Sequence, residues 1–292
     1  MKDVTLSLLS LVSVALMLSC SSQLAFSQDV NESPSNRPEQ QQQKQITAIF
    51  IADTQIGYFD SNKSYTKDSL NLELAVSKIN QIHPDFVVVN GDMINSSGSK
   101  KQLECFWSVM SKVSPDIPVW YVPGNHDVGN GTKDQKIESY INEFGYDRFS
   151  FTLENNPFIG INSCLIKDER IELEDEQFRW LKRAVKSSLK KKNATYIFCH
   201  HPFFIKKYDE NITYSNQSHE NRDKYWKLFK DNGVDAVFAG HVHNDEVSSH
   251  DGIGMITVGP VSKALGDGVS GIGICTFGDN DFEYEYIYLK DL

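Results

Sequence analysis

From residue 46 onward, short runs of apolar, often β-branched residues alternate with longer amphipathic runs, and this alternation restricts the fold more than any other feature. The two strand runs 149–153 and 158–164 are predicted to form an antiparallel hairpin. Strand–helix alternation occurs twice and a strand-rich tail follows, which predicts an α/β (α+β) fold with a two-sheet core covered by helices. The predicted strands are 46–52, 86–89, 117–122, 149–153, 158–164, 196–199, 234–239, 254–258, 272–277 and 282–289. The predicted helices are 66–83, 100–113, 135–144, 172–189 and 220–230.

Length and charge narrow the class of protein. A chain of 292 residues can bury a large core. It carries 39 acidic and 29 basic side chains, a formal net charge of -10. Because nucleic-acid binders that rely on phosphate contacts need a basic face, we expect no nucleic acid as a structural partner.

The N-terminus predicts a targeting segment. Residues 4–18 are apolar, but this run is shorter than the roughly 20 residues that span a bilayer, so we predict a signal peptide over 1–27. A lipoprotein signal ending at Cys20 and an uncleaved anchor are the alternatives. Residues 28–45, rich in glutamine, predict a disordered polar tether before a domain over 46–292. We therefore expect an exported protein (periplasmic, extracellular or lipid-anchored) that touches a membrane only through its N-terminus.

Polar side chains follow five of the predicted strands directly. Ligands in open α/β sheets gather beyond the carboxyl ends of strands, so these five loops are expected to meet at one site. A single loop Asp or His is usually a turn residue or a satisfied polar group, whereas five such loops in register with five strands indicate a site. The loops carry Asp53-x-Gln55, Gly91-Asp92, Gly124-Asn125-His126-Asp127, His200-His201-Pro202 and Gly240-His241-Val242-His243.

This ordered set of motifs resembles the calcineurin-like metallophosphoesterase superfamily, from about residue 46 to the C-terminus. Within it, the segment 52–57 and its Gln55 are most similar to the small calcineurin-like phosphoesterase-domain-containing serine/threonine phosphatases. The resemblance implies a four-layer αββα sandwich, with two central mixed β-sheets flanked by helices. It also implies hydrolysis of phosphomonoesters by a metal-bound hydroxide at a dinuclear site.

The resemblance assigns a role to each motif residue. Two divalent metal ions (Mn, Fe, Zn or Mg) would share Asp92, which also counts as catalytic. The remaining implied ligands are Asp53, Gln55 and His243 for one metal, and Asn125, His200 and His241 for the other. Oxygen and nitrogen donors of this kind suit these cations rather than Cu(I) or an iron–sulfur cluster.

The second catalytic residue implied by the family pattern is His126, which would protonate the leaving oxygen or stabilise its developing charge. Asn125, His126 and His201 are the expected substrate contacts, although packing of His201 against its strand end is an equal alternative. Asn95 stands where large protein phosphatases carry an Asp that supports this histidine, so another group must support His126. Tyr58, beside the first loop, is expected either to line the substrate entrance or to pack.

Three functions remain open from the sequence. The leading hypothesis is a metal-dependent phosphomonoesterase of the protein serine/threonine phosphatase type, acting as a monomer on a phosphoprotein or a small phosphoester. An exported phosphodiesterase or nucleotidase with the same site is the first alternative. The second is a catalytically silent tethered binding module, for which Gln55 in place of the usual histidine is the argument.

Overall fold

The protein is represented by a computed structural model, which describes residues 45–129, 134–169, 171–188, 194–278 and 281–292. The predicted signal peptide 1–27 with Cys20, and the predicted tether up to residue 44, lie outside the described residues. Among the helices that are described, none is both long and apolar enough to cross a membrane.

The first sheet has five strands in the order β11-β10-β1-β2-β3. Strands β1, β2 and β3 run parallel, while β10 pairs antiparallel with both β1 and β11, so the sheet is mixed. The strands are β1 (Ile46–Ile51), β2 (Phe86–Val89), β3 (Val119–Tyr121), β10 (Gly271–Phe277) and β11 (Phe282–Tyr288).

The second sheet has six strands in the order β4-β5-β6-β7-β9-β8. Its central strands β5, β6, β7 and β9 are parallel, and the two edge strands pair antiparallel with their neighbours. The strands are β4 (Phe149–Leu153), β5 (Asn156–Gly160), β6 (Thr195–Phe198), β7 (Val234–Ala239), β8 (Glu246–His250) and β9 (Ile253–Thr257).

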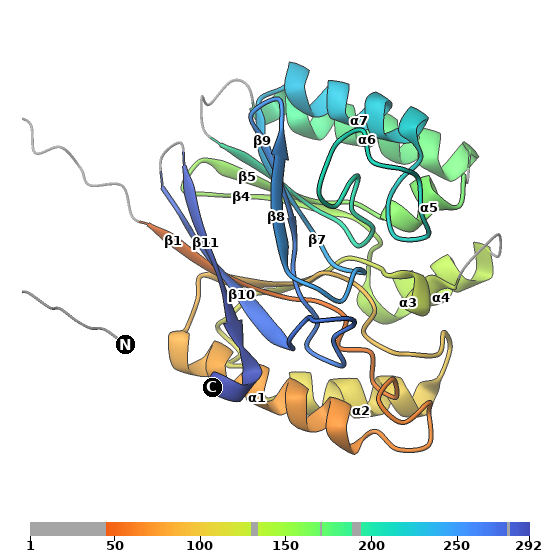
Figure 1. The fold of residues 1–292 in the computed structure, drawn as a ribbon, viewed down its shortest axis with the longest axis vertical. Coiled ribbons are helices and arrows are strands. Elements are labelled where there is room, and N and C mark those ends of the chain that lie inside the picture. The colour runs from red at the N-terminus through yellow and green to blue at the C-terminus, as the bar shows by residue number, and fades with distance from the viewer. Residues whose placement is uncertain (1–44, 130–133, 170, 189–193, 279–280) are drawn as a thin grey trace, which may run out of the picture. The chain divides into compact units, whose positions relative to one another are not determined.

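Helices cover the outer face of each sheet, with α1 and α2 on the first and α6 and α7 on the second (Figure 1). The result is a four-layer αββα sandwich, so the expected fold class is confirmed. The helices are α1 (Thr66–Ile82), α2 (Lys100–Met110), α3 (Asn125–Val128), α4 (Asp134–Phe144), α5 (Ser163–Lys167), α6 (Ile171–Ser188), α7 (His219–Asp231) and the 3₁₀ turn η1 (Leu289–Asp291).

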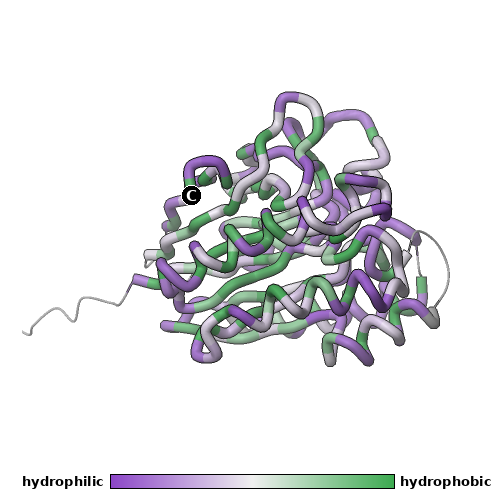
Figure 2. Tube along the Cα trace, turned by 90° about the horizontal axis from the view of Figure 1, so that it is seen from below, coloured by the Kyte–Doolittle hydropathy of each residue, from purple (hydrophilic) through white to green (hydrophobic). Residues whose placement is uncertain are grey.

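Apolar side chains fill the three spaces between these layers. The space between the two sheets is rich in aromatic rings, with Phe50 4.6 Å from Phe238 and 5.2 Å from Phe198 between ring centroids. In Figure 2 the central strands are mostly green, whereas the helices alternate between green and purple along their length. The sheets are therefore buried on both faces and form a rigid frame, and the loops at their carboxyl ends rest on it.

Several predicted elements differ from the structure. The predicted strand 158–164 is wrong after Gly160, because Asn162 caps helix α5 by accepting the N–H of Cys164 at 3.2 Å. The strand predicted over 117–122 is limited to β3, since Pro118 has no N–H to donate to a sheet. Sequence reasoning also missed the short helix α3 and the edge strand β8. Strand β8 contains few apolar residues, so no apolar run marks it in the sequence.

Candidate metal centre

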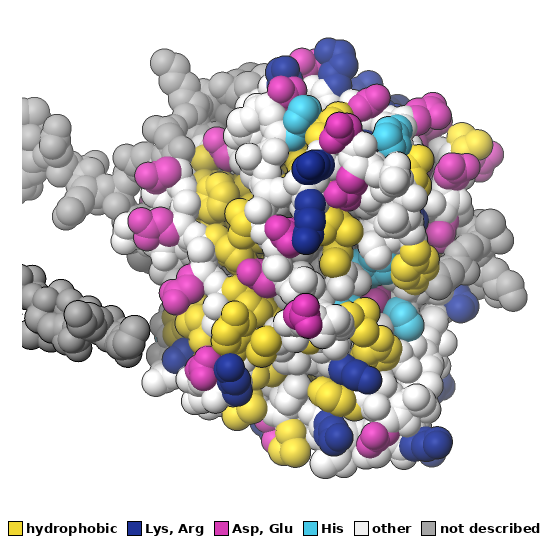
Figure 3. Space-filling view, in the orientation of Figure 1, with side chains coloured by type: hydrophobic (Ala, Val, Ile, Leu, Met, Phe, Trp, Pro, Cys, Tyr) yellow, Lys and Arg dark blue, Asp and Glu magenta, His cyan; other side chains and the backbone are white. Residues whose placement is uncertain are grey.

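All seven predicted metal ligands come together at the carboxyl ends of β1, β2, β3, β6 and β7. Each is at most 8% exposed, so the two sheets and their loops enclose them. In the space-filling view, histidine side chains reach the surface between the upper and lower helix layers, with hydrophobic side chains beside them (Figure 3). The strands thus gather residues that are nearly 200 positions apart in the chain, as Asp53 and the N–H of His241 illustrate with a 2.8 Å hydrogen bond.

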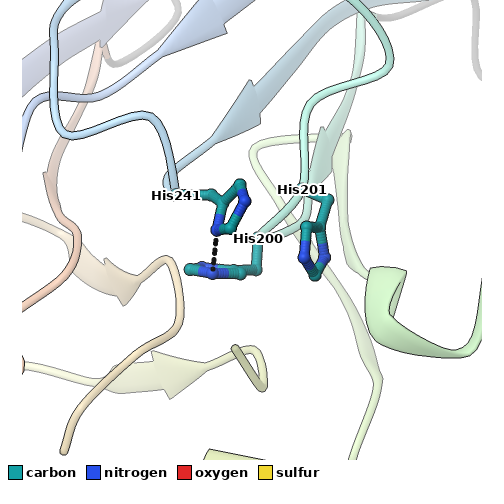
Figure 4. A group of neighbouring side chains, drawn as sticks. All are labelled: His200, His201 and His241. Atoms are coloured by element: carbon teal, nitrogen blue, oxygen red, sulfur yellow. Dashed lines mark hydrogen bonds between the residues drawn. The ribbon is translucent and has the colours of Figure 1, made fainter. Parts of the chain in front are cut away.

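Four donor atoms converge in the part of the site nearest β6. The Nε2 atom of His200 lies 3.1 Å from Asn125 Oδ1, 3.1 Å from His241 Nδ1 and 3.3 Å from Asp92 Oδ2. Figure 4 shows the contact between the rings of His200 and His241, and the ring of His201 lies beside them. These are the four residues that the family resemblance assigns to one metal.

A second group of donors adjoins the first through Asp92. His243 Nε2 lies 3.4 Å from Asp53 Oδ1, and the amide of Gln55 lies 3.4 Å from Asp92 Oδ2. The same Asp92 oxygen therefore faces both groups, so this carboxylate could be shared by two cations. The structure places the three further implied ligands of the second metal in this group.

Backbone carbonyls orient two of the histidines. His200 Nδ1 donates to the carbonyl of Asn90 at 2.9 Å, and His243 Nδ1 donates to the carbonyl of Lys263 at 2.7 Å. Because Nδ1 donates in both rings, Nε2 is the nitrogen that is left to bind a metal when either ring is neutral, and it faces the other donors. A histidine held in this way is the usual arrangement for a metal ligand.

Unsatisfied buried atoms show that the site fits a metal. Gln55 Oε1 and His241 Nε2 are buried without a hydrogen-bond partner among the described residues. Leaving such atoms unpaired costs about 1–3 kcal/mol each, which a bound cation would offset. Carboxylate, amide and imidazole donors suit Mn²⁺, Fe, Zn²⁺ or Mg²⁺. Groups of Asp53, Asp92 and His200, and of His200, His201 and His241, each have their donor atoms close enough to hold an ion.

Burial and charge act together on the ionisable groups of the site. Burial by itself would raise the pKa of Asp92, but His200 outweighs it and lowers that pKa to about 2. Burial likewise opposes the charged form of His200, yet Asp92 raises its pKa to about 9. Burial and the neighbouring His200 lower the pKa of His241 to about 4, so this ring is neutral at pH 7 and its nitrogen can bind a metal.

His126 lies half-buried next to the donor groups and is held by the Asp92 side chain and the main-chain carbonyl of Asn95. Its N–H donates to Asp92 Oδ1 at 2.7 Å, and its ring Nδ1 lies 2.6 Å from the carbonyl of Asn95. Sequence reasoning left the support of this histidine unassigned, and the structure assigns it to the Asn95 backbone. Asn95, which lacks the carboxylate that large protein phosphatases carry at this position, therefore supports His126 through its main-chain carbonyl.

Asp127 holds two of the ligand loops together. Its carboxylate accepts the N–H groups of Asp92 at 2.8 Å, Met93 at 2.9 Å, Ile94 at 3.3 Å and Gly124 at 2.8 Å. The short helix α3 begins within this network. The loop after β2 and the loop after β3 are therefore fixed to each other by one side chain.

The ligand loops adopt a backbone that ordinary residues avoid. Asp53, Gln55, Asp92, His241 and His243 all have positive φ, from 32° to 72°. Non-glycine residues pay about 1–3 kcal/mol each for such conformations, which are found mostly at functional sites.

Two motif glycines allow these loops to approach each other. A Cβ atom on Gly91 would collide with the ring of His200, and one on Gly124 would collide with the Asp92 carboxylate. The glycines of these motifs are therefore required by close contact between ligand loops.

His201 is buried beside this centre. It is 2% exposed, its ring centroid lies 4.3 Å from that of His241, and its Nδ1 faces Ser163 Oγ at 3.4 Å. Burial lowers the pKa of His201 well below its ordinary value. This position favours the packing alternative, and its role as a substrate contact stays a prediction.

Sequence reasoning missed Tyr214. Its phenol oxygen accepts a hydrogen bond from Asn125 Nδ2 at 3.1 Å, and its ring centroid lies 5.0 Å from that of His241. The motifs give no signal for this residue, because it belongs to a long loop with no fixed spacing to them.

Comparison with known proteins agrees with this geometry. Residues 46–245 match the family model described as calcineurin-like phosphoesterase. The chain is 30% identical to the serine/threonine-protein phosphatase CPPED1 of Danio rerio, over 81% of this chain and 80% of that protein. It is 28% identical to GpdQ of Arcobacter nitrofigilis, a probable glycerophosphodiester phosphodiesterase, over 55% of this chain and 57% of that protein.

A solved structure supports the fold. A dimetal phosphatase from Danio rerio superposes with a TM-score of 0.66, covering 84% of this chain and 96% of that chain at 16% identity. At this identity the likeness establishes the fold alone. Together with the family match and the donor groups, it leads to one conclusion: the chain belongs to the calcineurin-like phosphoesterase family and is a phosphoric ester hydrolase.

Proposed function

We propose that this protein is a metal-dependent phosphomonoesterase of the protein serine/threonine phosphatase type. The observation that carries the proposal is the pair of donor groups that share Asp92 Oδ2. The relative from Danio rerio, which this chain matches over 80% of that protein's length, is named a serine/threonine-protein phosphatase. That name supports a phosphomonoester substrate of the phosphoprotein type.

The chain's own residues would divide the work as follows. Two divalent cations, when bound, would polarise the phosphoryl group and supply a nucleophilic water near neutral pH. Asp92 would hold the two donor groups at a fixed separation, because its other oxygen is anchored by the N–H of His126 at 2.7 Å. Asn125 and the buried histidines would fix the orientation of the phosphoryl oxygens.

His126 would act as the proton donor. In its charged form the Nδ1 proton is held by the Asn95 carbonyl, so the Nε2 proton is the one available for transfer. The ring is half-buried, which leaves it reachable by a substrate while the metal ligands stay enclosed. A phosphoester whose leaving oxygen points toward His126 would therefore be protonated as its P–O bond breaks.

A substrate panel tests this proposal against a phosphodiesterase or nucleotidase. The purified protein is loaded with Mn²⁺ and given an aryl monoester, a bis-aryl diester and a set of nucleotides at equal concentration. Preferential hydrolysis of the monoester supports the proposal. Preference for the diester, in line with the name of the GpdQ relative, would replace it with the first alternative.

Two variants test the roles of the residues. Asp92→Asn should abolish activity and the bound metal, whereas His126→Ala should lower the rate about 10²–10⁴-fold with the metal retained. Asp116→Asn, on an exposed carboxylate paired with His83, is the matched control and should behave as wild type. Fewer than one bound metal per chain after loading, with no hydrolysis of any ester, would instead support the binding-module alternative.

We further propose that the protein is exported, on the strength of the apolar run at 4–18. The N-terminal segment lies outside the described residues. Fractionation of expressing cells with mass analysis of the N-terminus tests the export. A protein with an intact N-terminus in the cytoplasmic fraction would contradict it.

A further inference from the structure

Tyr214 borders the metal centre from a part of the chain that carries none of the motifs. Its phenol contacts Asn125 and its ring lies on His241, as described above, yet 61% of the residue is exposed. Tyr214 therefore lies at the boundary between the enclosed donors and solvent.

The loop that carries Tyr214, residues 205–218, is fixed from several directions. Glu210 accepts the N–H groups of three residues at the start of the loop, at 2.7 to 3.1 Å. The buried Arg222 of α7 donates to the carbonyls of Tyr208, Glu210 and Gln217. The position of Tyr214 is therefore built into the fold, although its side chain is exposed.

A cation from α5 secures the stretch around Tyr214 itself. Lys167 donates to the carbonyl of Thr213 at 2.8 Å and to that of Asn216. Asn216 in turn accepts the N–H of Thr213 at 2.8 Å and donates to Glu210 at 2.7 Å. The residues before and after Tyr214 are thus held to the body of the protein.

A second tyrosine lies beside the other donor group. The ring centroid of Tyr58, which follows β1, is 5.1 Å from that of His243, and this side chain is half-buried. Tyr58 and Tyr214 therefore each pack on one histidine of the same loop after β7. The centre has an aromatic ring next to each of its two donor groups, and Tyr214 is the more exposed of the two.

We propose that Tyr214 is a specificity-determining residue whose ring forms a wall against which a flat, unsaturated group attached to the phosphate stacks. This deepens the proposed function and rests on it. Stacking on an aromatic ring favours planar groups over short alkyl groups of the same charge. An aryl ester offers such a surface directly, and a peptide phosphorylated on serine or threonine offers its planar peptide groups beyond the saturated side-chain carbon, whereas a methyl ester offers none.

Binding of two non-hydrolysable anions separates this role from catalysis. Phenylphosphonate and methylphosphonate carry the same charged group and differ only in the attached group. Their affinities are measured by calorimetry on the Mn²⁺-loaded protein, for wild type, Tyr214→Ala, Tyr214→Phe and Tyr288→Ala. Tyr288 is an exposed tyrosine (41%) on the edge strand β11 and serves as the matched control.

The expected result is a selective loss. Tyr214→Ala should weaken phenylphosphonate about five- to tenfold and methylphosphonate by less than twofold. Tyr214→Phe keeps the ring and should keep the phenyl preference, as should Tyr288→Ala. Because Tyr214 is mostly exposed, its truncation leaves no cavity, and circular dichroism together with thermal melting checks the fold of each variant.

Three outcomes would overturn the inference. They are an equal loss of both phosphonates in Tyr214→Ala, no loss of either, and a wild type that binds neither anion. An equal loss would mean that Tyr214 acts only by holding the Asn125 amide. A wild type that shows the phenyl preference but hydrolyses no monoester would contradict the proposed function and leave the wall in place, so the two failures are distinguishable.

Discussion

The carboxylate of Asp127 offers the most direct test of how the ligand loops are held. Each of its oxygens accepts two backbone N–H groups: Oδ2 from Asp92 and Gly124, and Oδ1 from Met93 and Ile94. In Asp127→Asn one oxygen becomes an NH₂ group. Whichever way the amide turns, two buried N–H donors then face another donor.

The magnitude follows from those two donors. A buried donor left without an acceptor costs about 1–3 kcal/mol, so two of them should lower the free energy of unfolding by about 2–6 kcal/mol. Burial and the neighbouring Asp92 raise the pKa of Asp127. A raised pKa means that the fold does not favour the charged form of Asp127. The expected loss of unfolding free energy therefore counts only the unpaired donors and includes nothing for the lost charge. The N–H of Asp92 is one of the four, so the shared carboxylate should also shift and metal affinity should fall.

Urea unfolding of the metal-free protein at pH 7 measures the first effect, and titration with Mn²⁺ followed by calorimetry measures the second. Asp116→Asn, the exposed control with its side chain 63% accessible, should change stability by less than about 0.5 kcal/mol. If Asp127→Asn unfolds within 1 kcal/mol of wild type and binds Mn²⁺ equally well, the idea that this carboxylate fixes the two loops is refuted.

Other changes have equally specific expected results. Gly124→Ala places a methyl group against the Asp92 carboxylate, so metal content after Mn²⁺ loading should fall below half that of wild type; full loading would contradict this. Asn95→Ala should keep activity within about threefold, because His126 is held by the Asn95 carbonyl; a loss as large as that of His126→Ala would show that the side chain matters. Burial raises the pKa of Asp68 from 3.8 to about 6, so its contribution to stability is present below pH 4 and is lost as the pH rises through 6. Relative to Asp68→Asn, wild type should lose up to about 3 kcal/mol between pH 4 and pH 7 in urea unfolding, and parallel pH profiles would oppose this.

The regular elements were predictable where local pattern decides them. Helix α1 and strands β2 and β7 match their predicted ranges closely, because amphipathic spacing and buried apolar runs are local properties of the chain. Elements shaped by their surroundings were missed. The helix α5 depends on a cap from Asn162, and β8 exists because β9 offers it an edge to pair with.

The sequence predicted the two-sheet fold from its alternation of strands and helices, and it predicted one site because motif residues that directly follow strands lie at the strand ends. The seven candidate ligands came from the resemblance to a known family. Only the tertiary structure gave the distances within the two donor groups around Asp92 and showed that five of these residues adopt positive φ. It also decided that a main-chain carbonyl supports His126 and that Tyr214 borders the centre. Such contacts join loops distant in the chain, so no local pattern specifies them; the packing of one sheet against the other does.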